Sequence, residues 1–479
     1  MTIDLRRAIG PLSICVCLLL LSCCVADAQT ATKTAESPAK KYESIAKQIF
    51  DSARSGNDSF LKLQELCDDI GHRLSGSPSL DKAIEWAQAS MKKDGHENVQ
   101  AEKVLVNKWV RGKENCQLVS PREFNIPMLG LGGSVATPSS GITAEVVVVK
   151  DKDELDSLAD DKIAGKIVCF NFPMPKWTKE DSGYRSAVQY RSNGASWAAE
   201  RGGVAALVRS VTATSLQSPH TGAMRYDAKI EKVPTAAISV EAATMLSRLQ
   251  KRGITPKVKL YMEAKNEGEV PSANVVGEIV GSEKPEEIVV IGGHIDSWDV
   301  GQGAQDDGCG CVVAMEALTI LRKLKLKPRR TIRVVLWTNE ENGLGGAKSY
   351  AARHAEEVYV AGIESDSGGF KPEGLSIELE DDDKEEIAVV QLAEILKLLE
   401  PIGATRAKKS YSGADVSQLK PSGTACLGLN VDGRLYFNTH HTWADTVDKV
   451  NPKELTDCTI VVATAAFVIA DMPNRLGEK

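Results

Sequence analysis

A histidine and several carboxylates lie close together in a glycine-rich loop that follows an apolar run. Residues 288–291 are typical of a buried strand, and His294, Asp296 and Asp306 follow them. A neutral imidazole and carboxylate oxygens are ligands for divalent metals, zinc above all. Asp296 is placed to orient a ligating His294, and Asp306 has two oxygens with which to bridge two ions. A polar loop with a hydrogen-bonded histidine is the alternative interpretation.

Three further apolar runs end in residues of the same kinds. Of two neighbouring glutamates, one suits a metal ligand and the other a general base, and the residues alone do not say which. Together the four clusters predict a dinuclear metal site. The added candidates are Glu340 and Glu341 after residues 334–337, Asp366 after residues 361–363, and His440 and His441 in a loop beyond residues 426–430.

The elements that carry these clusters alternate between strands and helices, which predicts an α/β fold with a mostly parallel or mixed sheet between helices. Residues 99–110 alternate as an edge strand would. The expected strands of the sheet are 276–279, 287–291, 331–337, 358–364 and 425–430. The expected helices are 312–323, 347–357, 384–399 and 453–470.

The segment 125–265 has a different texture, because short β-rich runs are separated by glycine loops and carry no dense ligand cluster. We therefore expect an inserted β-rich domain that shapes access to a site held by the main domain, whose two parts are 41–124 and 266–479. His220 is a candidate substrate contact, since loops at domain junctions often line clefts. A surface loop is the alternative.

The first 28 residues have the pattern of a signal peptide. Arg6 and Arg7 precede a short apolar core, and residues 26–28 fit a cleavage site. Residues 20–23 also resemble a lipobox, which would leave a lipidated Cys23 on a membrane. Either outcome predicts export, to a secreted, periplasmic or extracellular location. We expect a disordered linker at 29–40 and no membrane span in the remainder.

Composition narrows the functional classes further. The net charge of −7 gives no reason to expect nucleic-acid binding, which needs clustered Lys and Arg. Outside the signal segment the cysteines are odd in number and scattered, so they predict no disulfide framework. Cys309 and Cys311, close to the metal loop, are interpreted as small core residues.

Beyond the signal segment, nearly the whole chain resembles the carboxypeptidase Q family of co-catalytic zinc exopeptidases. Matches inside the insert make the resemblance specific to this branch, and the insert takes the place of the family's protease-associated domain. The matching segments are 71–78, 187–191, 209–211, 294–307, 337–341, 364–366 and 441–446.

The resemblance implies two zinc ions per subunit and a role for each candidate. It selects His441 over His440, because the family's ligand stands four residues before an aspartate, here Asp445. The implied assignments are His294 and Asp366 on one ion, Glu341 and His441 on the other, Asp306 bridging both, Glu340 as general base, and Asp296 orienting His294.

The expected function is hydrolysis of short peptides, dipeptides above all, by a secreted and homodimeric dinuclear zinc exopeptidase. A loop containing Ser412, Gly413 and Asp415 corresponds to a family loop at the substrate pocket, with a surface turn as the alternative. Carboxypeptidase and aminopeptidase activity are not separated by the sequence. A catalytically silent binding protein on this fold, or a single-zinc glutaminyl cyclase, would lack ligands that are present here.

Overall fold

The structure is a computed structural model in which residues 37–478 are described. The signal segment and Cys23 of the lipobox lie outside the described residues. Helix α1 (Pro38–Gly56) begins inside the segment expected as a linker, with the hydroxyl of Ser37 accepting from its first turn. No helix within residues 37–478 is long and apolar enough to cross a membrane.

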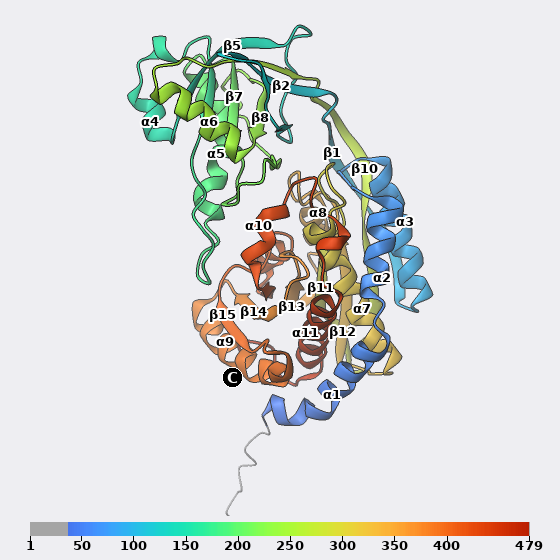
Figure 1. Cartoon of the computed structure of the whole chain (residues 1–479). Helices are drawn as coiled ribbons and strands as arrows, with labels where there is room; N and C mark the ends of the chain where they lie inside the picture. The colour runs from blue at the N-terminus through green and yellow to red at the C-terminus, as the bar shows by residue number, and fades with distance from the viewer. Residues whose placement is uncertain (1–36, 479) are drawn as a thin grey trace, which may run out of the picture. The chain divides into compact units, whose positions relative to one another are not determined.

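The main sheet is mixed, as the sequence predicts (Figure 1). Its four central strands are parallel: β12 (Arg330–Trp337), β11 (Lys284–His294), β13 (Val358–Glu364) and β16 (Ala425–Val431). On one side β10 (Lys265–Ile279) is antiparallel to β12, and β1 (Glu97–Val110) is antiparallel to β10. On the other side β14 (Pro372–Glu378) is antiparallel to β16, and β15 (Arg406–Lys409) is parallel to β14. The expected strands are confirmed, with β14 and β15 added.

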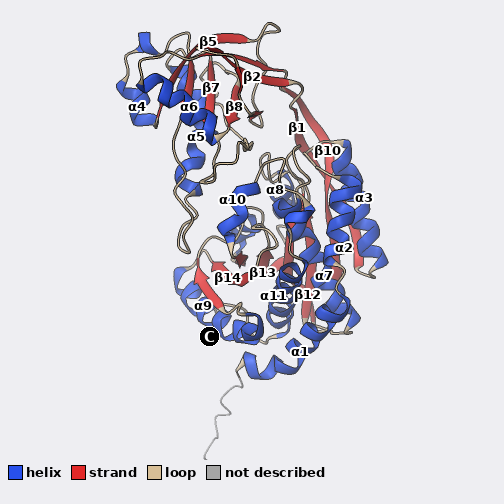
Figure 2. Cartoon of the chain, viewed as in Figure 1, coloured by secondary structure: helices blue, strands red, loops and turns tan. Residues whose placement is uncertain are grey.

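Helices cover both faces of this sheet (Figure 2). On one face α11 (Pro452–Asp471) packs against α7 (Cys309–Lys323) and α1. Helix α11 is buried almost all round, as an apolar helix between a sheet and other helices must be. The same core includes residues of α2 (Ser59–Gln64), α3 (Pro78–Lys93) and α9 (Asp382–Leu396), whereas α8 (Gly345–Arg353) and the 3₁₀ turn Val416–Ser422 cover the other face.

A second eight-stranded sheet is built from residues between β1 and β10. It begins with β2 (Glu114–Ser120), ahead of the expected boundary at residue 125, and ends with β9 (Lys257–Met262). The other strands are β3 (Phe124–Asn125), β4 (Met128–Gly130), β5 (Ile142–Val149), β6 (Ile167–Phe170), β7 (Ala205–Arg209) and β8 (Thr235–Ile238), and the helices are α4 (Lys152–Ser157), α5 (Tyr184–Glu200) and α6 (Val240–Lys251).

Strand pairing brings the predicted ligand loops to one edge of the main sheet. His294 pairs with Trp337 across β11 and β12, and Gly292 pairs with Glu364 across β11 and β13. The loops that follow these parallel strands therefore leave from the same edge, where open α/β sheets hold their ligands. Cys309 and Cys311 are buried in the core, as expected, and the seven cysteines within residues 37–478 are all free thiols.

Candidate metal centre

The first group of donor atoms combines one histidine with two carboxylates. Nε2 of His294 lies 3.3 Å from Oδ1 of Asp306 and 3.3 Å from Oδ1 of Asp366. Nδ1 of the same ring faces the main-chain carbonyl of Asp296 at 3.0 Å, with the Asp296 carboxylate at 3.7 Å. With Nδ1–H directed at the carbonyl, the Nε2 lone pair is available to a metal.

The second group uses the other oxygen of Asp306. Nε2 of His441 lies 3.1 Å from Oδ2 of Asp306 and 3.1 Å from Oε2 of Glu341. The indole N–H of Trp298 donates to that same Glu341 oxygen. Oδ2 of Asp306 and Oε1 of Glu341 are buried without a hydrogen-bond partner. The carboxylate of Asp306 thus divides its two oxygens between two histidines.

His440 competes with its neighbour for this second group. Its ring stacks on that of His441 with 3.5 Å between centroids, and its Nε2 lies 3.6 Å from Oδ2 of Asp306. Donor atoms of Asp306, His440 and His441 lie within 4.8 Å of one another, as do those of His294, Asp306 and Asp366. We favour His441 as the ligand because its Nε2 is nearer to Asp306 and also contacts Glu341.

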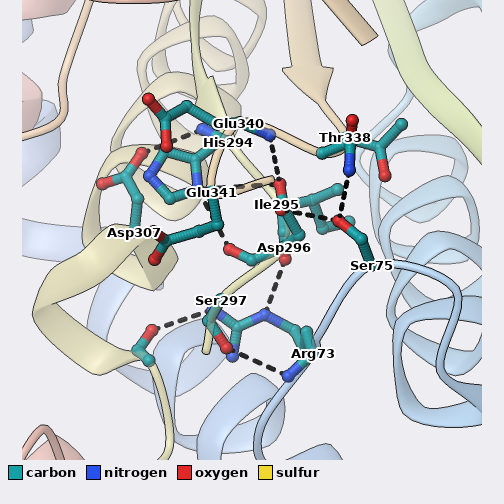
Figure 3. A network of polar contacts seen from close by, with 12 residues as sticks. Arg73, Ser75, His294, Ile295, Asp296, Ser297, Asp307, Thr338, Glu340 and Glu341 are labelled. Atoms are coloured by element: carbon teal, nitrogen blue, oxygen red, sulfur yellow. Dashed lines mark hydrogen bonds and ion pairs between the residues drawn. The ribbon is translucent and has the colours of Figure 1, made fainter. Parts of the chain in front are cut away.

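The predicted general base is tied to the first group through Asp296 (Figure 3). Oδ1 of Asp296 accepts from the main-chain N–H of Glu340 (3.0 Å), and Oδ2 accepts from the hydroxyl of Ser75 (3.0 Å). The carboxylate therefore holds the turn after β12, while the main chain of Asp296 orients the His294 ring. The sequence prediction assigned that orienting role to the side chain.

Two further aspartates hold the loop backbone. Asp307 accepts from the N–H of His294 (3.0 Å), and a Cβ on Gly293 would lie only 2.3 Å from the same carboxylate. Glycine at this position is therefore needed for that close approach. Asp445 accepts from the N–H groups of Gln305 (2.8 Å) and Asp306 (3.2 Å). In the sequence analysis Asp445 served only to mark the ligand histidine four residues before it, and this backbone-holding role was not predicted.

Arg73 is a second residue that holds the metal loop, and sequence analysis did not assign it a role. Its guanidinium donates to the carbonyls of Ile295 (2.7 Å), Gln302 (2.7 Å) and Gly303 (2.8 Å), and it is fully buried (Figure 3). One side chain thus satisfies three carbonyls of the loop that carries His294, Asp296 and Asp306.

Negative charge exceeds positive charge in this buried site. Burial raises the pKa of Glu340 well above its usual range, and Asp366 and Glu341 raise it further. Burial alone would lower the pKa of His441, but Glu341 and Asp306 raise it to about 9. Buried carboxylates without neutralising partners are costly, so the site favours bound cations.

The predicted substrate contacts occupy two places. Ser412 donates its hydroxyl to Glu378 (2.7 Å), and a Cβ on Gly413 would lie 2.3 Å from the carboxyl carbon of Glu364. Asp415 is only 1% exposed, and neither of its oxygens has a hydrogen-bond partner. His220 is 2% exposed, and burial lowers its pKa to about 3, so it is not in a surface loop; it is buried where the insert meets the loop of His440 and His441.

Comparison with known proteins agrees with this geometry. The profile of Peptidase family M28 matches residues 274–466. Carboxypeptidase Q of Mus musculus is 41% identical over 440 residues, which is 91% of each chain. The chain belongs to peptidase family M28. This membership makes it a metallopeptidase and confirms the resemblance to carboxypeptidase Q.

Two solved structures share this fold. A Peptidase M28 precursor from Shewanella amazonensis SB2B superposes with a TM-score of 0.86 at 34% identity, covering 91% of this chain and 98% of the other. A zinc aminopeptidase from Bacillus subtilis gives a TM-score of 0.61 at 18% identity, covering 86% and 94%. At that identity the second likeness concerns the fold alone.

Proposed function

We propose that this M28 peptidase is a dinuclear zinc exopeptidase that hydrolyses short peptides, dipeptides above all. The observation that carries the proposal is the division of the Asp306 carboxylate. One oxygen lies beside His294 and Asp366, and the other lies beside His441 and Glu341. A single shared carboxylate between two such groups is suited to bridging two cations.

The donor set fits zinc. Each group offers imidazole nitrogen and carboxylate oxygen, which zinc accepts in catalytic sites. The unpartnered oxygens of Asp306 and Glu341 supply ligand atoms that no hydrogen bond occupies. Two ions bound here would supply Lewis acidity that polarises the scissile carbonyl and lowers the pKa of the attacking water.

The residues of the chain then perform the proton transfer. Glu340 accepts the proton of the attacking water and delivers it to the leaving amine nitrogen, so that a carboxylate and a free amine result. Its main chain is fixed by Asp296, and no hydrogen bond within residues 37–478 engages its own carboxylate oxygens. Glu341 is instead committed to His441 and Trp298. This difference supports Glu340 as base and Glu341 as ligand.

A buried acidic pair supports recognition of a free α-amino group. Oε1 of Glu364 and both oxygens of Asp415 lack hydrogen-bond donors. Glu364 stands two residues before Asp366 of the first metal group, and Asp415 interacts electrostatically with Glu364. An ammonium group carries three N–H donors, which matches three unpartnered oxygens. We propose that the N-terminal amine of the substrate binds at Glu364 and Asp415. Such binding favours dipeptidase or aminopeptidase cleavage of the first peptide bond.

The test combines metal content with product analysis. Protein dialysed against a chelator should lose hydrolysis of dipeptides and regain full activity at two equivalents of zinc. A tripeptide series, with the released end identified, decides between aminopeptidase and carboxypeptidase cleavage. Full activity of protein shown to be metal-free would overturn the proposal. A catalytically silent binding protein is disfavoured because every ligand position is filled.

Export and assembly are proposed from the sequence. The signal pattern supports an exported protein, and the mass of the mature chain separates cleavage near Gln29 from lipidation at Cys23. The carboxypeptidase Q resemblance supports a homodimer. Sedimentation at working concentration tests this, and a monomeric mass would contradict it.

A further inference from the structure

A loop of the insert reaches the second metal group and holds His441 by two main-chain hydrogen bonds. The N–H of Thr221 donates to the carbonyl of His441 (3.0 Å). The carbonyl of Thr221 lies 3.2 Å from Nδ1 of His441 and is placed to accept a hydrogen bond from Nδ1–H. With an ion bound, this arrangement would keep the proton on Nδ1 and leave the lone pair of Nε2, which faces Asp306 and Glu341, for the metal.

His441 needs such support because its backbone is in the left-handed region, with φ of 61°. A residue other than glycine reaches this conformation at a cost in free energy, and keeps it only when its surroundings hold it there. Within the catalytic part, the ring lies between His440 and Trp298. The reciprocal hydrogen bonds to Thr221 come from the insert and fix both the main chain and the ring.

Arg191, on α5 of the insert, lies against the same contact. Its Nη1 is 3.5 Å from the carbonyl of Thr221 and 3.4 Å from Nδ1 of His441, and its Nη2 donates to Tyr184 (2.6 Å). Arg191 is 7% exposed, and its guanidinium packs on Gly222, where a Cβ would lie 2.4 Å from Nη1. The missing side chain at Gly222 therefore leaves the room that Arg191 occupies.

The side chain of Thr221 anchors this loop from the other direction. Its hydroxyl donates to the carbonyl of Gly130 (2.8 Å) and accepts from Arg111 (3.3 Å), and the residue is fully buried. Arg111 in turn holds Asp299, which lies in the loop after β11. The carbonyl that orients His441 is thus fixed on both sides, by the Thr221 hydroxyl and by Arg191.

We infer that Thr221 and Arg191 are positioning residues for His441, and that the insert completes the second metal site in addition to shaping access. The inference rests on the proposed dinuclear function. Loss of either side chain should release the Thr221 carbonyl, free the His441 ring and weaken one ion only. Within residues 37–478 no hydrogen bond or ion pair joins this loop to His294 or Asp366, so the ion that those residues would hold should stay.

The experiment measures metal binding by the full-length protein in a zinc titration against a competing chelator. Thr221→Val removes the hydroxyl and keeps the shape, and Thr221→Ser restores the hydroxyl. Arg191→Met keeps the length of the side chain without its donors. We expect Thr221→Val and Arg191→Met to retain one ion at wild-type affinity and to bind the other about 10–100-fold more weakly, the range seen when groups behind a metal ligand are lost.

Thr221→Ser should bind both ions as the wild type does, and thermal unfolding of the metal-free proteins checks that each variant is folded. Two ions bound at wild-type affinity by both Thr221→Val and Arg191→Met would overturn the inference, as would equal weakening of both ions. A wild-type protein that holds a single ion would overturn the dinuclear function instead. In that case weakening of this ion in Thr221→Val would still support positioning, and unchanged binding would reject it.

Discussion

The carboxylate of Asp296 accepts a hydrogen bond from the main-chain N–H of Glu340, with 3.0 Å between the two atoms. This contact joins the loop after β11 to the turn after β12, and both loops carry residues of the site (Figure 3). Asp296 therefore connects the strand end that bears a metal ligand to the residue that we propose as base. The position of Glu340 depends on it.

Asp296→Ala should lower kcat at least about tenfold, because the N–H of Glu340 loses its acceptor. Metal content should stay unchanged, because His294 is oriented by the main-chain carbonyl of residue 296, which the substitution keeps. A buried N–H left without a partner costs about 1–3 kcal/mol of unfolding free energy. Ser75→Ala is the comparison, since it keeps the contact between Asp296 and the N–H of Glu340 and removes the hydrogen bonds of Ser75 to Asp296 and Asn339. Steady-state kinetics and metal analysis check this, and an unchanged kcat in Asp296→Ala would contradict the coupling.

Glu340→Gln should retain two zinc ions and lose turnover by about 10²–10⁴-fold, because glutamine keeps the shape and cannot accept a proton from water. Glu341→Gln is the matched comparison and should instead weaken zinc at the His441 group. Metal analysis and kinetics on the same preparations separate the two effects. Near-normal turnover by Glu340→Gln, or its loss of metal, would reject the division of roles between the neighbouring glutamates.

The central strands and the ligand clusters could be predicted because both leave strong local signals. Apolar runs of β-branched residues mark β11 and β12, and a polar residue at each strand end marks a loop. Strand β15 could not be predicted in this way, since residues Arg406–Lys409 are polar and lie at the edge of the sheet. Such a strand is defined by its partner β14 and not by its own composition.

The supporting groups of the site were missed for a related reason. Arg73 donates to the main-chain carbonyls of Ile295, Gln302 and Gly303, which are more than 200 residues away, and no sequence pattern predicts such a contact. Thr221 contacts His441 through main-chain atoms, which every residue has, so a threonine at this position does not indicate the contact. The buried state of His220 also follows from packing that is distant in sequence. Metal ligands can be predicted because only a few residue types bind metals. The residues that hold them in place cannot, because their role depends on where the fold puts them.

Glu364→Gln and Asp415→Asn should each reduce discrimination for a free α-amino group. For the wild type we expect a high ratio of kcat/KM between a dipeptide and its analogue with hydrogen in place of the amino group. The ratio should fall at least about tenfold in each variant, because a charge-assisted hydrogen bond contributes roughly 1.5–3 kcal/mol. Ser412→Ala is the control, since Ser412 donates to Glu378. An unchanged ratio in both variants would place the amine elsewhere.

A titratable network distant from the metal groups gives a prediction about stability. His354, at the end of α8, hydrogen-bonds Glu102 and Glu357, and these contacts raise its pKa to about 9. Burial opposes ionisation of Glu357, but His354 and Arg333 lower its pKa well below the usual range. Arg353 also faces Glu102, and Tyr359 donates to Glu357. The imidazolium of His354 therefore stabilises the folded state.

His354→Gln should destabilise the protein most at low pH. The folded pKa of about 9 exceeds the unfolded value of 6.5, so the contribution of His354 is fully present below pH 6.5 and is lost as pH rises through 9. The difference in unfolding temperature between wild type and variant should be large near pH 6 and small near pH 10. Tyr359→Phe is the control: the pKa of Tyr359 is raised above its usual value of 10, so its phenol is protonated in the folded and the unfolded chain up to about pH 9, and its difference should stay constant from pH 6 to pH 9 while that of His354→Gln falls. A pH-independent difference for His354→Gln would show that the ring contributes by packing on Tyr350 and not by charge.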